Sequence, residues 1–188
     1  EASDDDALPA LELAAAQARR AADVVARLRR LVQPAPMDTA GEPVDLAALA
    51  GQLVGWMQPG LARRGIGFRV EGQAPPVRVD RVAVEQILHN LLLNATQALQ
   101  AVPPDRRQIV LELSAAVARV RAVVRDSGPG VAAEHRARLF EPFFTTRPDG
   151  LGLGLPLCQS LAQALGGQLE LEPAAAGAAP GGAAFVLI

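Results

Sequence analysis

The hydrophobic positions of the first 40 residues predict one long helix over residues 8–32. They recur at steps of three and four residues and form a single apolar stripe of Leu11, Ala15, Ala18, Ala22, Val25, Leu28 and Val32. The opposite face carries mainly arginine, and Pro34 and Pro36 end the pattern. A lone amphipathic helix of this length needs a partner surface, and the alanine-rich stripe suits close packing against another helix.

The rest of the chain, after a linker at residues 37–43, mixes helical and strand-like patterns. Helical spacing covers residues 45–64, 155–165 and the stretch from Asp80 to just before the Pro103-Pro104 pair. Strand-like alternation covers residues 66–70, 77–79, 109–117, 119–125, 168–172 and 183–188, with 109–117 and 119–125 forming a β-hairpin. This order lacks the strict alternation of a doubly wound sheet. It predicts an α+β fold: a two-layer α/β sandwich with a mixed sheet and helices on one face, preceded by the long N-terminal helix.

Composition and charge narrow the class of protein. Half of the 188 residues are hydrophobic, and the formal net charge of −2 gives no sign of the clustered basic surface of a nucleic-acid-binding protein. All 18 basic residues are arginine, so any cation that contacts a phosphate is an arginine. The lone Cys158 excludes an internal disulfide and fits a small buried hydrophobe in a reducing compartment. No apolar run reaches the ~20 residues of a membrane span. We therefore expect a cytoplasmic domain without membrane contact, with any inner-membrane anchor of a longer parent protein outside this chain.

Two asparagines stand on the predicted helix that begins at Asp80. Asn90 and Asn94 are four residues apart, so they project from one face of that helix, among leucines that form its buried side. An amide oxygen is a hard ligand that suits Mg²⁺, which usually keeps several waters and shares phosphate oxygens. The alternative is that the backbone satisfies both side chains, and the pair alone does not decide between these interpretations.

A second motif, Asp126-Ser127-Gly128-Pro129-Gly130, follows directly after a predicted strand. A carboxylate at a strand end is able to accept a hydrogen bond from the exocyclic amine of a base, and glycines let the backbone approach a flat ring. The same composition is also typical of a plain turn.

A third motif alternates glycine and leucine from Gly150 through Gly152 and Gly154 to Leu155, at the start of a helix. Backbone amides without side chains, next to a helix N-terminus, favour anion binding. No Gly-Lys-Ser/Thr follows and no strand precedes, so neither a Walker loop nor a dinucleotide fingerprint fits.

Between the last two motifs lie three of the five phenylalanines, Phe140, Phe143 and Phe144. They indicate either a hydrophobic latch within a flexible loop or simple core packing. Arg147 stands just before the glycine loop, where it is placed to reach a terminal phosphate or to remain a solvated surface arginine.

The four motifs in this order strongly resemble the catalytic domain of sensor histidine kinases, part of the ATPase superfamily shared with gyrase, the Hsp90 chaperones and MutL. The resemblance covers about residues 44–188 and implies the Bergerat-type ATP-binding fold. By this resemblance Asn94 coordinates Mg²⁺, Asn90 lies beside the phosphates as the second catalytic asparagine, and Asp126 recognises the adenine amine. The implied ATP-binding set is Asn90, Asn94, Asp126, Gly128, Gly130, Phe140, Phe144, Thr146, Arg147, Gly150, Gly152, Gly154 and Leu155. The related subgroup usually has lysine where Arg147 stands, and the exchange keeps the charge but changes the geometry.

The same resemblance divides the chain into residues 1–36, with one helix of the dimerisation and phosphotransfer hairpin, and residues 37–188, the catalytic domain. The other hairpin helix, which carries the acceptor histidine, is not in this sequence; His89 fits local packing or hydrogen bonding, and His135 a solvated turn. The parent enzyme is thus expected to be a bacterial homodimeric histidine kinase in a phosphorelay. It transfers the γ-phosphoryl group of ATP to its hairpin and then to the receiver domain of a response regulator. This chain alone is expected to bind Mg-ATP without normal autophosphorylation.

Two other classes stay open. One is a hydrolase or serine kinase of the same superfamily, although its hydrolases place glutamate where this chain has Asn90. The other is a degenerate interaction module that no longer binds nucleotide, against which the intact Asn94, Asp126 and loop glycines count.

Overall fold

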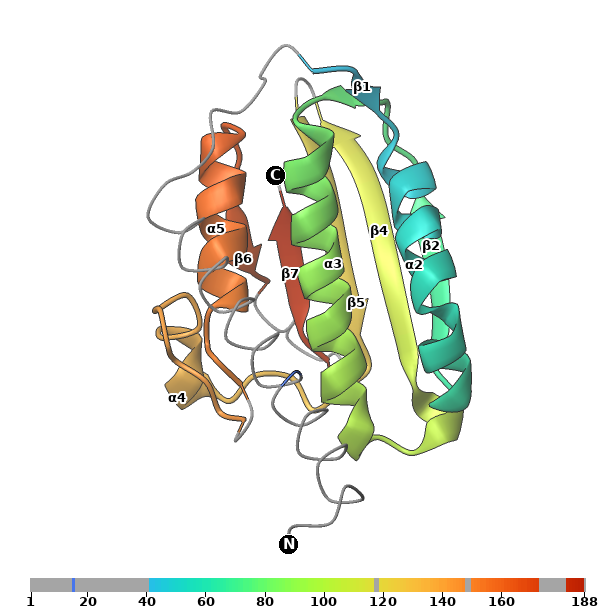
Figure 1. The fold of residues 1–188 in the computed structure, drawn as a ribbon, viewed down its shortest axis with the longest axis vertical. Helices are drawn as coiled ribbons and strands as arrows, with labels where there is room; N and C mark the ends of the chain where they lie inside the picture. Colours follow the sequence, from blue (N-terminus) through green and yellow to red (C-terminus); the bar gives the residue numbers. More distant parts are fainter. Residues whose placement is uncertain (1–14, 16–40, 117–118, 148–149, 173–181, 188) are drawn as a thin grey trace, which may run out of the picture.

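The computed structural model describes residues 15, 41–116, 119–147, 150–172 and 182–187, and places them in two layers (Figure 1). One layer is a five-stranded mixed sheet, and the other consists of three long helices that lie against one face of it. The strands are β2 (Gly67–Gly72), β4 (Gln108–Ala116), β5 (Arg119–Asp126), β6 (Leu169–Leu171) and β7 (Ala184–Leu187). The helices are α2 (Leu46–Arg63), α3 (Arg81–Ala98) and α5 (Gly154–Ala164), with a short α4 (Ala133–Arg136) beside them. The predicted fold class is therefore confirmed.

The strand order β2-β4-β5-β7-β6 makes β2 and β6 the edges of the sheet. β2 pairs with β4 in parallel, and all other pairs are antiparallel. The predicted hairpin is β4 and β5, in a register that sets Ile109 opposite Asp126. The predicted strand at 77–79 is β3 (Val77–Arg78), which pairs outside the main sheet with β1 (Pro43–Val44). Pro43 falls within the predicted linker, because a strand of two residues is too short to carry a periodic signal.

Two of the helices begin at an aspartate that caps them. Asp45 accepts hydrogen bonds from the amides of Ala47 and Ala48 at 2.9 and 3.0 Å, and Asp80 accepts from Ala83 at 3.0 Å. Each cap contributes about 1 kcal/mol to helix stability. The helix α5 has no such cap, so the first amides of α5 are left without a side-chain acceptor.

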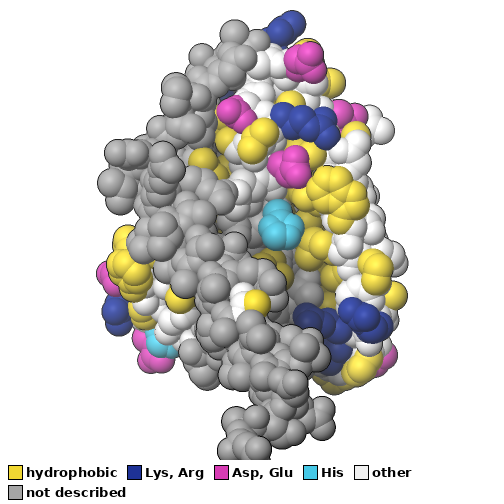
Figure 2. Space-filling view, viewed as in Figure 1, with side chains coloured by type: hydrophobic (Ala, Val, Ile, Leu, Met, Phe, Trp, Pro, Cys, Tyr) yellow, Lys and Arg dark blue, Asp and Glu magenta, His cyan; other side chains and the backbone are white. Residues whose placement is uncertain are grey.

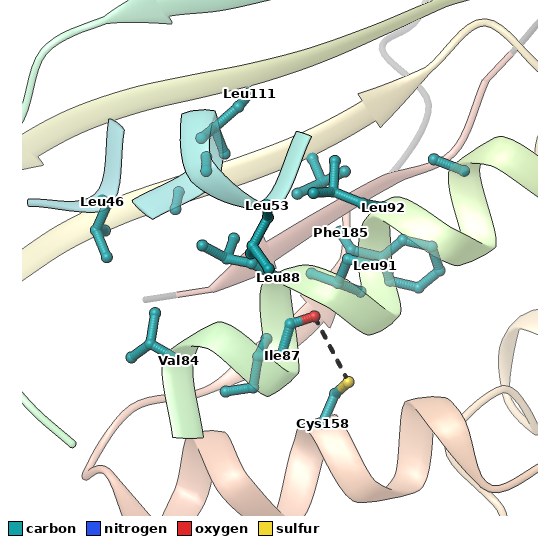
Figure 3. Packing of buried hydrophobic residues seen from close by; sticks show 14 of the residues in the cluster. Leu46, Leu53, Val84, Ile87, Leu88, Leu91, Leu92, Leu111, Cys158 and Phe185 are labelled. Atoms are coloured by element: carbon teal, nitrogen blue, oxygen red, sulfur yellow. Dashed lines mark hydrogen bonds between the residues drawn. The ribbon is translucent and has the colours of Figure 1, made fainter. Parts of the chain in front are cut away.

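The main core lies between the helices and the sheet (Figure 3). Leu88, Leu91 and Leu92 of α3 are at most 2% exposed and face leucines of α2, the sheet and Phe185 of β7. Cys158 is fully buried beside the carbonyl of Ile87, with 3.9 Å between the sulfur and the oxygen. This confirms the expectation of a small buried hydrophobe.

The opposite face of the sheet has its own small buried cluster of Val123, Ala184 and Val186. A chain of ion pairs runs across the same region: Arg125 contacts Glu112 and Glu172 at 2.7 Å each, and Arg121 contacts Glu172 at 2.5 Å. The aliphatic parts of long charged side chains shield apolar surface while their heads stay in water. In the described part of the chain, these strands therefore keep buried residues on both faces although helices cover only one.

The outer surface of the helical layer carries both hydrophobic and charged side chains. In Figure 2, hydrophobic side chains lie among arginine, acidic and histidine side chains over α2 and α3. Among the residues that the structure describes, Trp56 and Val82 are the most exposed large hydrophobic residues, at 72% and 73%. Among the helices described, none has the length and apolar content needed to cross a membrane.

Of the predicted helix over residues 8–32, only Ala15 is described, and it is helical. The remainder of that helix and the division at residue 36 lie outside the described residues, as does the low-complexity stretch at 174–182, which we expect to be a loop, except for its last residue, Gly182.

Candidate functional site

Asp126 ends β5 as a buried carboxylate, only 6% exposed. Its Oδ1 accepts hydrogen bonds from the backbone amides of Gly128 at 2.8 Å and Ala183 at 3.3 Å. Within the described residues no donor reaches Oδ2. Burial raises the pKa of Asp126, while the two amides and the positive charge of Arg147 act in the opposite direction. The site thus holds one strong, unused acceptor at the end of a strand.

Glycines make room around this carboxylate. A Cβ on Gly128 would lie 2.6 Å from Oδ1 of Asp126 and 3.1 Å from the Cβ of Ala98 in α3. Gly182, with φ of +100°, would place a Cβ 1.9 Å from the carbonyl oxygen of Asp126, and Gly130 has φ of +74°. Both conformations favour glycine. We missed Gly182 because it ends a low-complexity stretch; the glycine pair just before the last strand was the available signal.

The two asparagines of α3 differ in their surroundings. Asn90 is only 5% exposed, and its Nδ2 has no hydrogen-bond acceptor among the described residues. Such an unsatisfied buried donor costs about 1–3 kcal/mol. Asn94 lies one turn further along α3 and is half-buried. A buried amide donor without an acceptor is expected of a side chain that binds a ligand.

These side chains fit a hard cation shared with phosphate oxygens. No group of three or more His, Cys, Asp or Glu side chains suited to hold a metal occurs in the described part of the chain. A magnesium ion would therefore rely on amide oxygen and on the phosphates themselves, which is the usual way that Mg²⁺ binds with a nucleotide.

The three phenylalanines at 140, 143 and 144 differ in their surroundings, so neither the latch nor the core-packing interpretation describes all of them. Phe140 packs on the main core. Phe144 is half-buried, with the Arg138 guanidinium 4.4 Å from its ring centroid and the His135 ring centroid at 5.6 Å. Phe143 is 65% exposed. His135, expected in a solvated turn, lies on α4 and is partly solvated: about a third of its side chain is exposed, and its ring is tilted at 57° to that of Phe144.

The glycine loop folds back on this segment. The Phe143 amide donates to the Gly152 carbonyl at 3.0 Å, so residues 143 and 152 close the base of the loop. Gly152 has φ of +63°, and a Cβ there would lie 2.4 Å from the carbonyl carbon of Phe143. Gly150 packs equally tightly on Thr145. Gly154 differs, because a Cβ there meets nothing within 4 Å. Gly154 begins α5 and is followed by Leu155, and no side chain caps this helix start.

Arg147 joins the loop to α3. Its Nη1 donates to Oε1 of Gln97, its Nη2 donates to the Asn94 carbonyl at 3.3 Å, and Thr145 Oγ1 accepts from its backbone amide at 3.0 Å. Burial lowers the pKa of Arg147, and the charge of Asp126 raises it. No motif in the sequence singles out Gln97.

The C-terminal half of α3 is therefore where the motifs meet. Gly128 packs on Ala98, and Arg147 binds Gln97 and the backbone of Asn94. Thr146 is exposed and makes no hydrogen bond or ion pair with a described residue, and Leu155 packs partly on the core. A separate groove of about 380 Å³ lies elsewhere, beside β6, α5 and Phe140.

Comparison with known proteins gives one family. Residues 79–188 match the family model described as histidine kinase-, DNA gyrase B-, and HSP90-like ATPase. The C4-dicarboxylate transport sensor protein DctS of Rhodobacter capsulatus is 33% identical over 171 residues, covering 89% of this chain and 26% of DctS. The sensor protein FixL of Bradyrhizobium diazoefficiens is 34% identical over 173 residues, covering 90% of this chain and 34% of FixL.

Among solved structures, full-length ShkA in complex with AMPPNP is similar at a TM-score of 0.71 and 34% identity. The match covers 87% of this chain and 33% of ShkA. The chain thus spans about a quarter to a third of the length of these relatives.

Proposed function

Because the chain belongs to the histidine kinase-, DNA gyrase B-, and HSP90-like ATPases, we propose that it is the ATP-binding catalytic region of a sensor histidine kinase. It binds Mg-ATP between α3, the end of β5 and the glycine loop. It donates the γ-phosphoryl group to a histidine on a hairpin helix outside this chain, from which a response regulator takes it. In the parent protein the hairpin also forms the homodimer.

The observation that carries this proposal is the pairing of an unused acceptor with an unused donor. Asp126 is a buried carboxylate with one oxygen unused by the described residues, and Asn90 is a buried amide whose Nδ2 lacks an acceptor among them. Keeping either group buried opposes folding. A nucleotide removes both penalties, because its base supplies an amine for the carboxylate and its phosphates supply oxygens for the amide.

The chain's own groups then divide the work of binding. Asp126 accepts from the exocyclic amine of adenine, and the glycines at 128 and 130 leave space for the ring. Asn90 donates to a phosphate oxygen, as do the amides at the start of α5. Arg147 provides the positive charge near the terminal phosphate. Catalysis is then mainly positioning and charge stabilisation, since phosphoryl transfer needs little covalent chemistry from the protein.

Magnesium would be held by the Asn94 amide oxygen together with phosphate oxygens, and would supply charge neutralisation at the triphosphate. We assign the acceptor role to neither histidine of the chain. His89 lies on α3 directly before Asn90, where it is exposed rather than packed as its sequence context predicts, and it is fixed on the helix that holds the proposed phosphate ligands. His135 lies on α4, with its ring tilted against that of Phe144. The phosphoryl group therefore passes to a histidine delivered by another element.

Phosphoryl transfer in trans tests the proposal. The chain is mixed with [γ-³²P]ATP, Mg²⁺ and a separately produced hairpin that carries the acceptor histidine, and label on the hairpin is followed. Acid-labile, base-stable label on that histidine is the expected result. Fast phosphate release without label would favour a hydrolase, and nucleotide-independent binding of the hairpin without label would favour an interaction module; either would overturn the proposal.

A further inference from the structure

Gln97 lies on α3 three residues after Asn94, on the same face of the helix. Its side-chain oxygen accepts a hydrogen bond from Nη1 of Arg147, fifty residues further along the chain. The second terminal nitrogen of Arg147 donates to the Asn94 carbonyl at 3.3 Å. One guanidinium is thus held at two points on the last turns of α3, beside the proposed magnesium ligand.

The chemistry of this contact is specific. The oxygen of Gln97 is neutral, so it fixes the guanidinium without cancelling its charge, whereas a glutamate there would form an ion pair. A guanidinium has five N–H donors, and the two contacts leave the others for an anion. Arginine also has many rotamers, and ordering it in advance removes a cost that would otherwise oppose binding.

We propose that Gln97 is a positioning residue that holds Arg147 over the phosphates of the bound nucleotide. This rests on the proposed function, since it assumes that ATP lies between α3 and the glycine loop. Gln97 does not touch the adenine end of the site, where Asp126 and Gly128 lie. Its contribution is therefore expected to act through Arg147 and to depend on the β- and γ-phosphates, which AMP lacks.

The test compares Gln97→Ala, Arg147→Ala and the double variant by calorimetry with Mg-ATP and with AMP. Gln97→Ala is expected to weaken Mg-ATP binding about 3- to 10-fold, because binding must then also order the long side chain of Arg147. The same variant is expected to leave AMP binding unchanged. In the Arg147→Ala background the same change is expected to have no further effect. Gln100→Ala is the matched control, because Gln100 is exposed one turn later and offers only its backbone oxygen, to Arg107. Thermal melting of each variant confirms that it is folded.

Equal losses for AMP and Mg-ATP would mean that Gln97 only supports the end of α3, and would overturn the inference. So would an effect that persists without Arg147, or no effect at all in a chain that binds Mg-ATP normally. A wild-type chain that does not bind Mg-ATP would overturn the proposed function as well, so the two failures are distinguishable.

Discussion

Asp126→Asn separates the functional role of the buried carboxylate from its structural role. Asparagine has nearly the same shape and keeps an Oδ1 that accepts from the amides of Gly128 and Ala183. The change replaces the unused Oδ2 with an NH₂ group. A donor then faces the exocyclic amine of adenine, which is also a donor.

The loss of affinity follows from this exchange. A hydrogen bond to a charged group is worth about 1.5–3 kcal/mol, which corresponds to roughly 10- to 150-fold in the dissociation constant. We therefore expect Mg-ATP binding to weaken at least about 10-fold by calorimetry at neutral pH. The control is Asp105→Asn, which alters an exposed aspartate in the 3-10 turn at Pro104–Arg106.

The thermal stability of the Asp126→Asn variant is expected to rise, although its affinity for Mg-ATP falls. Burial raises the pKa of Asp126, so the folded protein holds this proton more readily than the unfolded chain does, and ionisation at neutral pH opposes folding. Asparagine carries no charge at any pH. The variant is therefore expected to melt at a higher temperature than wild type at pH 7. This advantage shrinks as the pH falls through the pKa of Asp126. Unchanged Mg-ATP affinity, or an advantage that grows in acid, would refute the reasoning.

Four further substitutions test the other parts of the site. Asn90→Leu removes an unsatisfied buried donor, so we expect the free energy of unfolding to rise by about 1 kcal/mol in urea titration while Mg-ATP binding is lost; lower stability would contradict this. Gly154→Ala is expected to leave the melting temperature unchanged but to weaken Mg-ATP binding, because its Cβ enters the open space before α5. Gly152→Ala is expected to lower both, since its Cβ would meet the Phe143 backbone; equal behaviour of the two glycine variants would count against the loop geometry. Phe144→Ala loses the contact with Arg138 and is expected to speed proteolysis at the loop, and an unchanged digestion rate would argue against anchoring.

Much of the framework could be predicted because it depends on local periodicity. The alternation of Val and Leu predicted the hairpin of β4 and β5, and that hairpin places Asp126 at the end of a strand. The spacing of Asn90 and Asn94 predicted a shared helical face, and both lie on α3. Each of these features is encoded within about 20 residues of sequence.

Features that depend on contacts between distant segments could not be predicted. Gln97 became significant only because the loop brings Arg147 onto α3, and Gly182 only because β7 pairs beside β5. The edge position of β2, in parallel with β4, has no local signal either. The tilted ring contact between His135 and Phe144 likewise arises from the fold of the loop rather than from neighbouring residues.

A nitrogen–proton correlation NMR titration with the non-hydrolysable analogue Mg-AMPPNP tests the central claim most directly, because glycine amides occupy a distinct part of the spectrum. The account predicts saturable shifts at Gly128, Gly152 and Gly154, with no change at Gly51 and Gly60, which lie on α2 away from the site. Shifts confined to α2 or to the groove beside β6, or no saturable shifts, would contradict it.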